Sequence, residues 1–216
     1  SPFAKISILS KFEQMYLSYT PSLVQRFFNG FTWKVETTEK VLYLTFDDGP
    51  IPEVTPWVLD VLDEFHAKAT FFCVGENVMR NPDIFNDIKA RGHSIGSHTY
   101  NHLSGWTTPS AAFLKNIRKA SQITQSKLFR PPYGRISPHQ ARILQNHFQI
   151  VMWDVLSGDF DLNIDKETCF QNVIKNASEG SIVVFHDSLK SKEKLNYALP
   201  KVLEYYSNLG YRFERI

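Results

Sequence analysis

The sequence predicts an α/β protein whose parallel strands alternate with amphipathic helices. Short apolar runs, rich in β-branched and aromatic residues, recur from Val41 to the end of the chain. Segments with helical periodicity lie between them, and unusual polar residues follow several of the runs. This rhythm is typical of a parallel sheet covered by helices, which could close into an imperfect barrel or remain open. A chain of 216 residues is long enough to bury one continuous core.

The first run, Val41-Leu42-Tyr43-Leu44, has the composition of a strand that is buried on both faces. The turn signal Gly49-Pro50 follows it closely. Six further runs complete a set of seven predicted strands, at 41–46, 69–74, 93–96, 127–129, 150–155, 181–185 and 211–215.

The intervening segments predict six helices, at 55–66, 83–91, 110–125, 138–146, 166–178 and 194–208. Asn81-Pro82 and Ser137-Pro138 are start signals, because asparagine and serine cap helix N-termini and proline suits the first turn. Gly92, Gly180 and Gly210 are stop signals, because glycine readily adopts the left-handed conformation that ends many helices.

Residues 1–40 precede the first predicted strand and carry none of the polar motifs. We therefore expect an N-terminal extension, residues 1–40, that packs on a domain formed by residues 41–216. Apolar residues near the N-terminus are interrupted by Lys5, Lys11 and Glu13, which predicts a short surface-docking helix rather than a signal peptide.

Composition excludes some classes of function. A formal net charge of +2 gives no broad basic field, so nucleic acid is not an expected partner. No apolar run reaches the length of a membrane-spanning helix. Cys73 and Cys169 lack the spacing of a metal or redox motif, and Cys73 lies in an apolar run that predicts burial. The oligomeric state is left open.

Polar residues suited to metal binding or catalysis follow five of the predicted strands. In parallel α/β folds the carboxyl ends of the strands meet at one rim, where active sites lie. We therefore expect these residues to lie near one another. They are Asp47 and Asp48, His98 and His102, Arg130 and Tyr133, Asp154 and Asp159, and His186 and Asp187.

The first two motifs together predict a metal site. Asp47 and Asp48 would repel each other unless a cation neutralised one carboxylate and oriented the other, although such a pair before Gly-Pro is also typical of a solvated turn. His98 and His102 are four residues apart and would share one face of a helical turn. Two imidazoles and one carboxylate leave coordination positions open, as in catalytic sites. His93 begins its strand and is expected to be structural.

The segment Phe129-Arg130-Pro131-Pro132-Tyr133-Gly134 predicts a rigid extended loop, because residues before proline avoid the helical region. Arg130 is either an ordinary surface residue or the partner that orients one of the rim carboxylates. Rigidity around Tyr133 would allow its backbone N–H to point at a developing oxyanion.

His186 ends a buried apolar run and is a candidate general acid if a metal site lies opposite. Asp154 and Asp159 could hold His186 in its protonated form, whereas Asp187 is expected to stabilise the turn.

These motifs occur in a specific order: Thr-Phe-Asp-Asp-Gly-Pro, His-Thr-x-x-His, Arg-Pro-Pro-Tyr, Trp-Asp…Asp and Val-x-His-Asp. This order, over residues 41–216, resembles the polysaccharide deacetylases of carbohydrate esterase family 4, the NodB homology domain. The resemblance implies a distorted seven-stranded (β/α) barrel and metal-dependent removal of acetyl groups from a glycan. The expected bond is an N-acetyl amide, with O-acetyl left open, in peptidoglycan, chitin oligomers or xylan.

The resemblance also implies a role for each residue. Asp47 resembles the catalytic base, Arg130 the residue that orients it, and Tyr133 the oxyanion donor. His186 resembles the general acid, and Asp159 the partner that tunes it. Asp48, His98 and His102 resemble the metal ligands; Zn²⁺ is the expected ion, and Co²⁺, Ni²⁺ or Mn²⁺ would also suit such a site.

The chain departs from the family pattern at Leu103, where proline is usual, at Leu156, where aspartate is frequent, and at Phe160, where tryptophan is usual. None of these changes removes a predicted ligand, acid or base, so activity is expected with an altered groove wall. Trp106 and Tyr133, with Phe160, are candidates for stacking on sugars.

Two alternatives stay open: hydrolysis of a small non-glycan amide or cyclic imide, and a catalytically silent glycan-binding module. The expected substrates suggest the cell envelope or secretion, although no export signal is visible in the chain.

Overall fold

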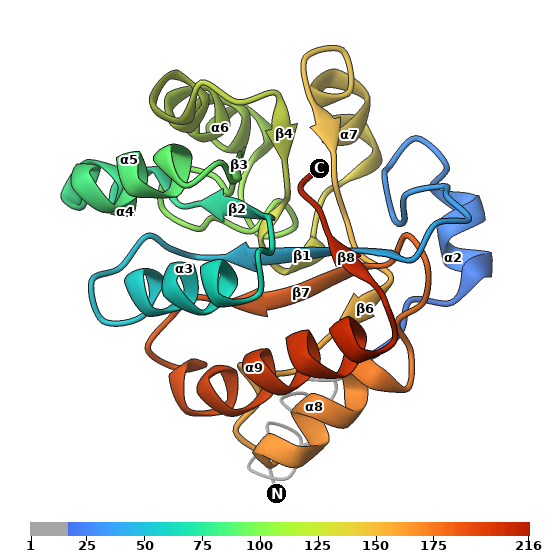
Figure 1. Ribbon diagram of the computed structural model, residues 1–216. Coiled ribbons are helices and arrows are strands. Elements are labelled where there is room, and N and C mark those ends of the chain that lie inside the picture. The colour runs from blue at the N-terminus through green and yellow to red at the C-terminus, as the bar shows by residue number, and fades with distance from the viewer. Residues whose placement is uncertain (1–16) are drawn as a thin grey trace, which may run out of the picture.

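The computed structural model describes residues 17–216, and the helix predicted near the N-terminus lies outside the described residues. An eight-stranded parallel sheet has the order β5-β4-β3-β2-β1-β7-β6, with β8 paired to the start of β1. The strands are β1 (Val41–Asp47), β2 (Ala69–Cys73), β3 (Ser94–Ser97), β4 (Leu128–Phe129), β5 (Gln149–Ile150), β6 (Val155–Leu156), β7 (Ile182–His186) and β8 (Arg212–Phe213). Figure 1 shows β1 and β7 crossing the centre of the molecule.

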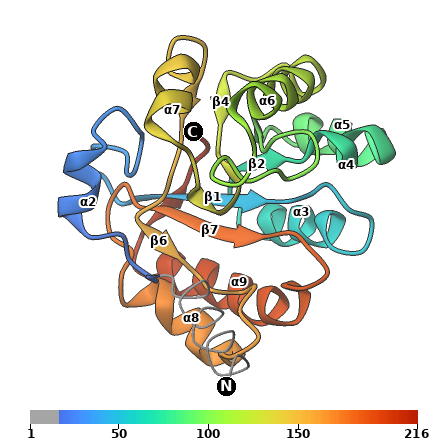
Figure 2. The ribbon, with the colours of Figure 1, turned by 180° about the vertical axis from the view of Figure 1, so that it is seen from behind.

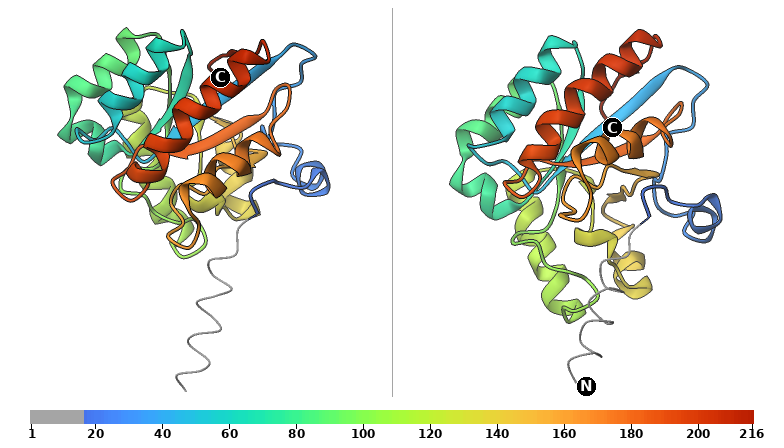
Figure 3. Two further views of the ribbon diagram at one scale, coloured as in Figure 1. Left: turned by 60° about the horizontal axis from the view of Figure 1, so that its bottom comes forward. Right: turned by 90° about the horizontal axis from the view of Figure 1, so that it is seen from below.

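Helices surround the sheet. They are α2 (Ser22–Phe27), α3 (Thr55–Glu64), α4 (Gly75–Arg80), α5 (Pro82–Ala90), α6 (Ser110–Thr124), α7 (Pro138–Leu144), α8 (Lys166–Ile174) and α9 (Lys192–Asn208). Figure 2 shows the sheet from the side opposite α3 and α9, and Figure 3 shows α8 and α9 packed side by side. Among the helices of residues 17–216, none combines the length and the apolarity that crossing a bilayer requires.

The predicted α/β class and the curled parallel sheet of a distorted barrel are confirmed. All six predicted helices occur, with bounds shifted by a few residues at several ends. Two short helices, α2 and α4, were not predicted. Each has only six residues, which is too short to show a helical periodicity in the sequence.

The side chains of strand β1 alternate between the two faces of the sheet. Its alternate residues Leu42, Leu44 and Phe46 are fully buried in the main core, together with apolar residues of α3 and α9. The Phe46 ring stacks on Phe71 of β2 at 5.0 Å. Because side chains alternate along a strand, Thr45 and Asp47 point to the other face, toward the interior of the barrel. The main core therefore fixes the position of the polar end of β1.

The prediction of one continuous strand at 150–155 is wrong. The structure divides it into β5, which pairs with β4, and β6, which pairs with β7. These two strands form the two ends of the sheet, so the barrel has a seam at residues 151–154. Residues before β1 contact this seam through isolated bridges at Tyr19–Val155 and Thr32–Val151.

Asp154 explains the break in pairing at the seam. Its carboxylate accepts hydrogen bonds from the Ser181 hydroxyl and from the Ile182 N–H, both at 2.7 Å. The Asp154 side chain thus accepts a hydrogen bond from the backbone N–H at the start of β7, and regular pairing with β7 begins at Val155.

Candidate metal centre and active site

Arg130 and Asp47 form a buried ion pair at the centre of the rim. Asp47 ends β1 and Arg130 follows β4. The Arg130 Nη1 donates to Asp47 Oδ1 and to Thr45 Oγ1, each at 2.7 Å. Arg130 is fully buried, and a buried guanidinium is costly unless its donors are satisfied. The structure thus brings together the arginine and one of the two aspartates that the sequence singled out.

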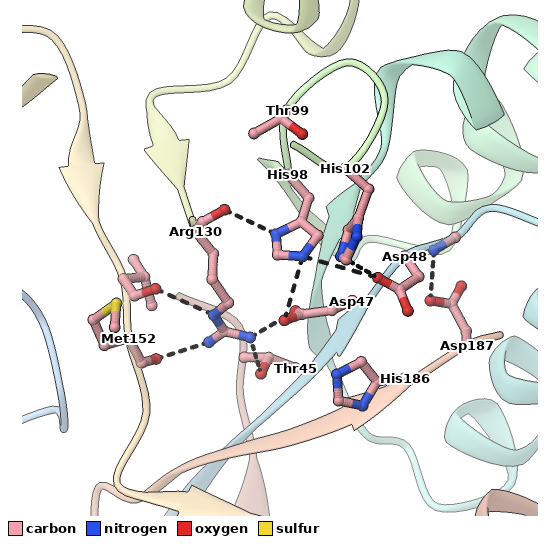
Figure 4. A network of polar contacts seen from close by, with 12 residues as sticks. Thr45, Asp47, Asp48, His98, Thr99, His102, Arg130, Met152, His186 and Asp187 are labelled. Atoms are coloured by element: carbon pink, nitrogen blue, oxygen red, sulfur yellow. Dashed lines mark hydrogen bonds and ion pairs between the residues drawn. The ribbon is translucent and has the colours of Figure 1, made fainter. Parts of the chain in front are cut away.

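The remaining Arg130 donors reach across to the seam of the barrel. Nε donates to the Val151 carbonyl at 3.1 Å and Nη2 to the Met152 carbonyl at 2.9 Å. The guanidinium carbon lies 4.1 Å from the centre of the Phe72 ring, which is a cation–π contact. Figure 4 shows the hydrogen bonds of the Arg130 side chain to Thr45, Asp47 and Met152. The orientation of Asp47 is therefore fixed by a side chain that is itself held on several sides.

The second aspartate of the pair has different neighbours. Asp48 offers Oδ1 to the two imidazoles, at 3.2 Å from His102 Nε2 and 3.9 Å from His98 Nε2. One ligand atom from each of these three residues lies within 4.8 Å of the others. This is the Asp-His-His group that the sequence predicted as a metal site, and Figure 4 shows its members pointing toward one another.

The protonation of His98 suits a metal ligand. His98 Nδ1 lies 2.8 Å from the Arg130 carbonyl oxygen, which can only accept a hydrogen bond, so we assign the proton to Nδ1. The lone pair of Nε2 then faces Asp48. Burial lowers the pKa of His98 to about 4, so the ring is neutral at neutral pH. Metal-binding histidines commonly use one nitrogen in this way and anchor the other.

The residues present fit a divalent cation. Asp48 Oδ1 is buried without a well-directed hydrogen bond in the described part of the chain, although a carboxylate oxygen so placed needs a partner. Burial acts to raise the pKa of Asp48, but contact with His102 and the nearby imidazoles outweighs it and lowers that pKa. An ionised oxygen facing imidazole nitrogens is a donor set that zinc and other first-row ions accept.

The loop that carries the two histidines is not the helical turn that the sequence predicted. Thr99 and His102 have φ angles of 65° and 60°, in the left-handed region, so the chain turns back on itself instead. The Leu103 N–H donates to Thr99 Oγ1 at 3.2 Å. A proline at position 103 has no N–H to donate, so the departure at Leu103 provides a hydrogen bond inside this turn.

Asp187 holds the loop that follows Asp48. Its carboxylate is buried and accepts hydrogen bonds from the Gly49 N–H at 3.0 Å and the Thr55 hydroxyl at 2.6 Å. A Cβ at position 49 would lie 1.9 Å from Asp187 Oδ2, so only glycine allows this approach. Burial raises the pKa of Asp187 to about 7, against the effect of its two hydrogen bonds. The expectation that Asp187 stabilises the turn is consistent with this geometry.

Several residues of this network carried no signal in the sequence. Thr55 begins α3, and its hydroxyl also accepts the Ile51 N–H at 2.9 Å. Asn77 in α4 donates to the Asp48 carbonyl at 2.8 Å. Asn77 reaches the loop backbone from an element 29 residues away, and Thr55 links the loop to Asp187, so both contacts are visible only in the tertiary structure.

His186 and Asp159 form the second ionisable pair at the rim. His186 Nδ1 lies 2.8 Å from Asp159 Oδ1, and the His186 backbone N–H donates to Asp159 Oδ2 at 2.7 Å. Burial alone would lower the pKa of His186, but the adjacent Asp159 carboxylate raises it to about 9. Of the two candidate carboxylates, Asp159 therefore contacts His186, whereas Asp154 contacts Ser181 and Ile182 at the start of β7. The Phe160 ring meets His186 edge-on at 5.1 Å.

Strand register places the two pairs side by side. Asp47 of β1 is the register partner of His186 of β7, and the two strands are parallel neighbours. Register partners on adjacent strands project to the same face, so the carboxylate and the imidazole point to the same side of the sheet. Nothing in the sequence showed this pairing, because it depends on which strands are neighbours.

Tyr133 lies in a short 3₁₀ turn, Pro132–Gly134, with a φ of 61°. Its ring is 61% exposed and packs edge-on against His102 at 4.8 Å. Outside its own turn, the Tyr133 N–H donates to no acceptor in the part of the chain that the structure describes. It is therefore a free backbone donor beside the candidate metal ligands.

His93 lies apart from this group. It is buried against the Phe71 ring and its Nδ1 accepts the Ala69 N–H at 3.2 Å. Burial lowers the pKa of His93 to about 4. Its neutral ring packs in the core, as the sequence predicted.

Comparisons with known proteins agree with this geometry. The family model for polysaccharide deacetylases matches residues 34–148. The chain is 36% identical over 189 residues to a peptidoglycan-N-acetylglucosamine deacetylase of Bacillus cereus, covering 84% of this chain and 89% of that protein. It is 28% identical to the peptidoglycan-N-acetylmuramic acid deacetylase PdaC of Bacillus subtilis, covering 82% of this chain and 38% of PdaC.

A solved structure shares the fold. It is a peptidoglycan N-acetylglucosamine deacetylase in complex with an N-oxidanyl-benzamide, and it superposes with a TM-score of 0.81 at 32% identity. The alignment covers 90% of this chain and 94% of that one.

The Arg130–Asp47 pair is expected to contribute strongly to stability. Arg130→Met leaves Asp47 buried without its cation, and we expect the free energy of unfolding to fall by about 3–5 kcal/mol. Urea denaturation would measure this loss. The control is Arg212→Met, because Arg212 is 62% exposed in its pair with Glu39, and an exposed pair contributes about 0–1 kcal/mol. Similar losses in the two variants would contradict the analysis.

The close approach of Gly49 to Asp187 predicts an effect on metal binding. Gly49→Ala must displace the loop that carries Asp48, and we expect zinc affinity to fall about 10–100-fold, as for other changes in the support of metal ligands. A competition titration with a chromophoric chelator would measure it. Thr55→Ser keeps the hydroxyl that Asp187 accepts and should retain the affinity. An unchanged affinity in Gly49→Ala would show that the loop tolerates a side chain.

Proposed function

The chain belongs to the polysaccharide deacetylase family, and we propose that it hydrolyses N-acetyl groups on a glycan of the peptidoglycan type. The single observation that best supports this function is the arrangement of Asp47, the Asp48-His98-His102 group and His186 at one rim. It provides a base, a candidate cation site and an acid within one small region. The relatives named above act on N-acetyl sugars, which favours the same bond here.

We propose that Asp48, His98 and His102 hold a divalent cation, with zinc as the expected ion and Co²⁺, Ni²⁺ or Mn²⁺ as alternatives. When bound, such an ion lowers the pKa of water and polarises a carbonyl oxygen. Asp48 serves as the anionic ligand, and His98 stays neutral and oriented because the Arg130 carbonyl accepts its Nδ1 proton.

Asp47 serves as the general base in this proposal. Arg130 holds one of its oxygens, Oδ1, and leaves Oδ2 facing His98 Nε2 at 4.0 Å. A water that attacks the acetyl carbonyl carbon would lose its proton to this free oxygen. The Tyr133 N–H would donate to the acetyl oxygen as its negative charge develops.

His186 serves as the general acid. The C–N bond breaks as the His186 proton passes to the leaving nitrogen, which gives acetate and a free amine. An amide nitrogen leaves poorly without this proton, so an acid with a raised pKa is suited to N-deacetylation. Asp159 keeps His186 in its protonated form. Neighbouring carboxylates thus take different roles because their surroundings differ.

A peptidoglycan substrate would place the action of the protein at the cell wall. The site also suits an extended substrate, because Asp48, His102 and Tyr133 are partly or largely exposed. A hollow of ≈ 250 Å³ beside Asp48 and His102 is lined by Asn77 and Asn101 among others, which offers polar partners for sugar hydroxyls.

The function is tested by release of acetate from an N-acetylated peptidoglycan tetrasaccharide and from an N-acetylated chitin tetramer. Ring opening of a small cyclic imide to its half-amide is measured in parallel. We expect acetate from a glycan, loss of activity after chelation, and recovery on addition of at least one of the four ions. Asp47→Asn and His186→Ala should each lower kcat by about 10²–10⁴-fold. Asp47→Asn should still bind zinc, whereas Asp48→Ala should not.

Other results separate the alternatives. Glycan binding without acetate release would indicate a silent binding module, and turnover of the cyclic imide alone would indicate a small-amide hydrolase. Near wild-type kcat in purified Asp47→Asn or His186→Ala would overturn the assigned roles.

The raised pKa of His186 predicts the alkaline limit of activity. His186 keeps its proton as the pH rises to about 9, so kcat should fall only above that value. Asp159→Asn removes the negative charge that raises the pKa of His186 against the effect of burial. The decline of kcat at alkaline pH should therefore begin at a lower pH. The measurement is kcat against pH. Asp154→Asn is the control, because Asp154 contacts Ser181 and Ile182 instead. An unmoved decline in Asp159→Asn would argue against His186 as the acid.

A further inference from the structure

Trp106 is an unusual surface residue near the candidate active site. Its side chain is 67% exposed, yet its position is fixed by its own N–H, which donates to the Ile136 carbonyl at 3.3 Å. The preceding residue, Gly105, donates its N–H to the Arg135 carbonyl at 3.1 Å and accepts a hydrogen bond from Gln140 at 2.9 Å. A large aromatic ring is thus held rigidly at the surface, which lowers the entropy cost of binding a ligand.

Arg135 lies between two aromatic rings. Its guanidinium carbon is 5.3 Å from the centre of the Trp106 ring and 5.6 Å from that of Tyr133. Within residues 17–216, the Arg135 guanidinium forms no hydrogen bond and no ion pair. The rings therefore orient a half-buried cation whose N–H donors are unused.

This arrangement is continuous with the catalytic rim. The Tyr133 ring also contacts the His102 ring at 4.8 Å, so Trp106, Arg135, Tyr133 and His102 form an unbroken line of contacts. A glycan with its acetyl group at His102 would extend along this line. Its neighbouring sugar would then meet an exposed indole ring and a free guanidinium.

We propose that Arg135 binds a carboxylate on the sugar next to the one that is deacetylated, while Trp106 stacks on that sugar ring. This inference rests on the proposed function and deepens it, because it names an acidic glycan as the preferred substrate. A guanidinium held by its faces keeps its edge free for a carboxylate, which it binds through two parallel hydrogen bonds. Peptidoglycan offers such a group on the lactyl ether of its muramic acid or on its stem peptide, whereas chitin offers none.

The test compares one glycan in three forms. The peptidoglycan tetrasaccharide is used with free lactyl carboxylates, with those carboxylates converted to methyl esters, and with stem peptides attached. We expect kcat/KM for the better acidic form to exceed that for the ester about tenfold or more, the range of a charge-assisted hydrogen bond. The acidic form with the higher kcat/KM identifies the source of the carboxylate.

Arg135→Gln should reduce this acid-to-ester ratio to near one. The matched control is Arg142→Gln, which removes the same charge from an exposed position in α7 and should keep the ratio. Arg135→Lys keeps the charge without the planar fork and should give an intermediate ratio, which also covers the case in which Arg135→Gln folds poorly. Trp106→Ala should raise KM for the acidic and the ester forms alike.

Binding separates this inference from the proposed function. The Kd of the acidic and ester forms is measured by titration calorimetry on Asp47→Asn and on the double variant that also carries Arg135→Gln. A Kd ratio that disappears with Arg135 supports the inference even if no acetate is released, in which case the proposed function alone fails. The inference would be overturned if the wild-type protein showed no preference for the acidic form over the ester. It would also be overturned if Arg135→Gln kept that preference.

Discussion

The buried guanidinium of Arg130 is the constraint on which the site depends. It joins the end of β4 to the end of β1 and reaches the carbonyls of Val151 and Met152 at the seam. The barrel lacks regular strand pairing at this seam, because β5 and β6 pair with different neighbours. One side chain thus orients the Asp47 carboxylate and also supplies hydrogen bonds to backbone groups that the missing ladder would leave unpaired.

The adjacent carboxylates illustrate how neighbours in sequence acquire different chemistry. Asp47 still belongs to β1 and points to the inner face, where Arg130 meets it. Asp48 has left the strand with a φ of 89°, and its carboxylate turns toward the imidazoles of His98 and His102. The Asp187 carboxylate and the Asn77 amide hold this turn from either side. In the proposed function, a cation would meet one ionised ligand, Asp48, and the Asp47 carboxylate would remain free to accept a proton.

Much of this arrangement could be predicted from sequence because the signals were local. Apolar runs located the strands, and the polar motifs that follow them located the rim. The seam could not be predicted, because the run 150–155 is uniformly apolar up to Trp153 and its division depends on Asp154 contacting β7. The left-handed residues Thr99 and His102 were also missed, since histidines four residues apart fit a helix equally well. Supporting contacts from Thr45, Thr55 and Asn77 depend on tertiary packing and have no local pattern.

The backbone of the rim shows why rigid support is needed there. Asp48, Thr99, His102 and Tyr133 all have positive φ angles, a conformation that is unfavourable for residues other than glycine. Such residues persist only where their surroundings fix them, and here each belongs to a segment tied down by buried hydrogen bonds or by packing. The main core of β1, β2, β7, α3 and α9 provides the stability that offsets this strain. The proposed metal ligands and the proposed oxyanion donor are therefore held in place without a bound substrate, which is the condition for electrostatic catalysis.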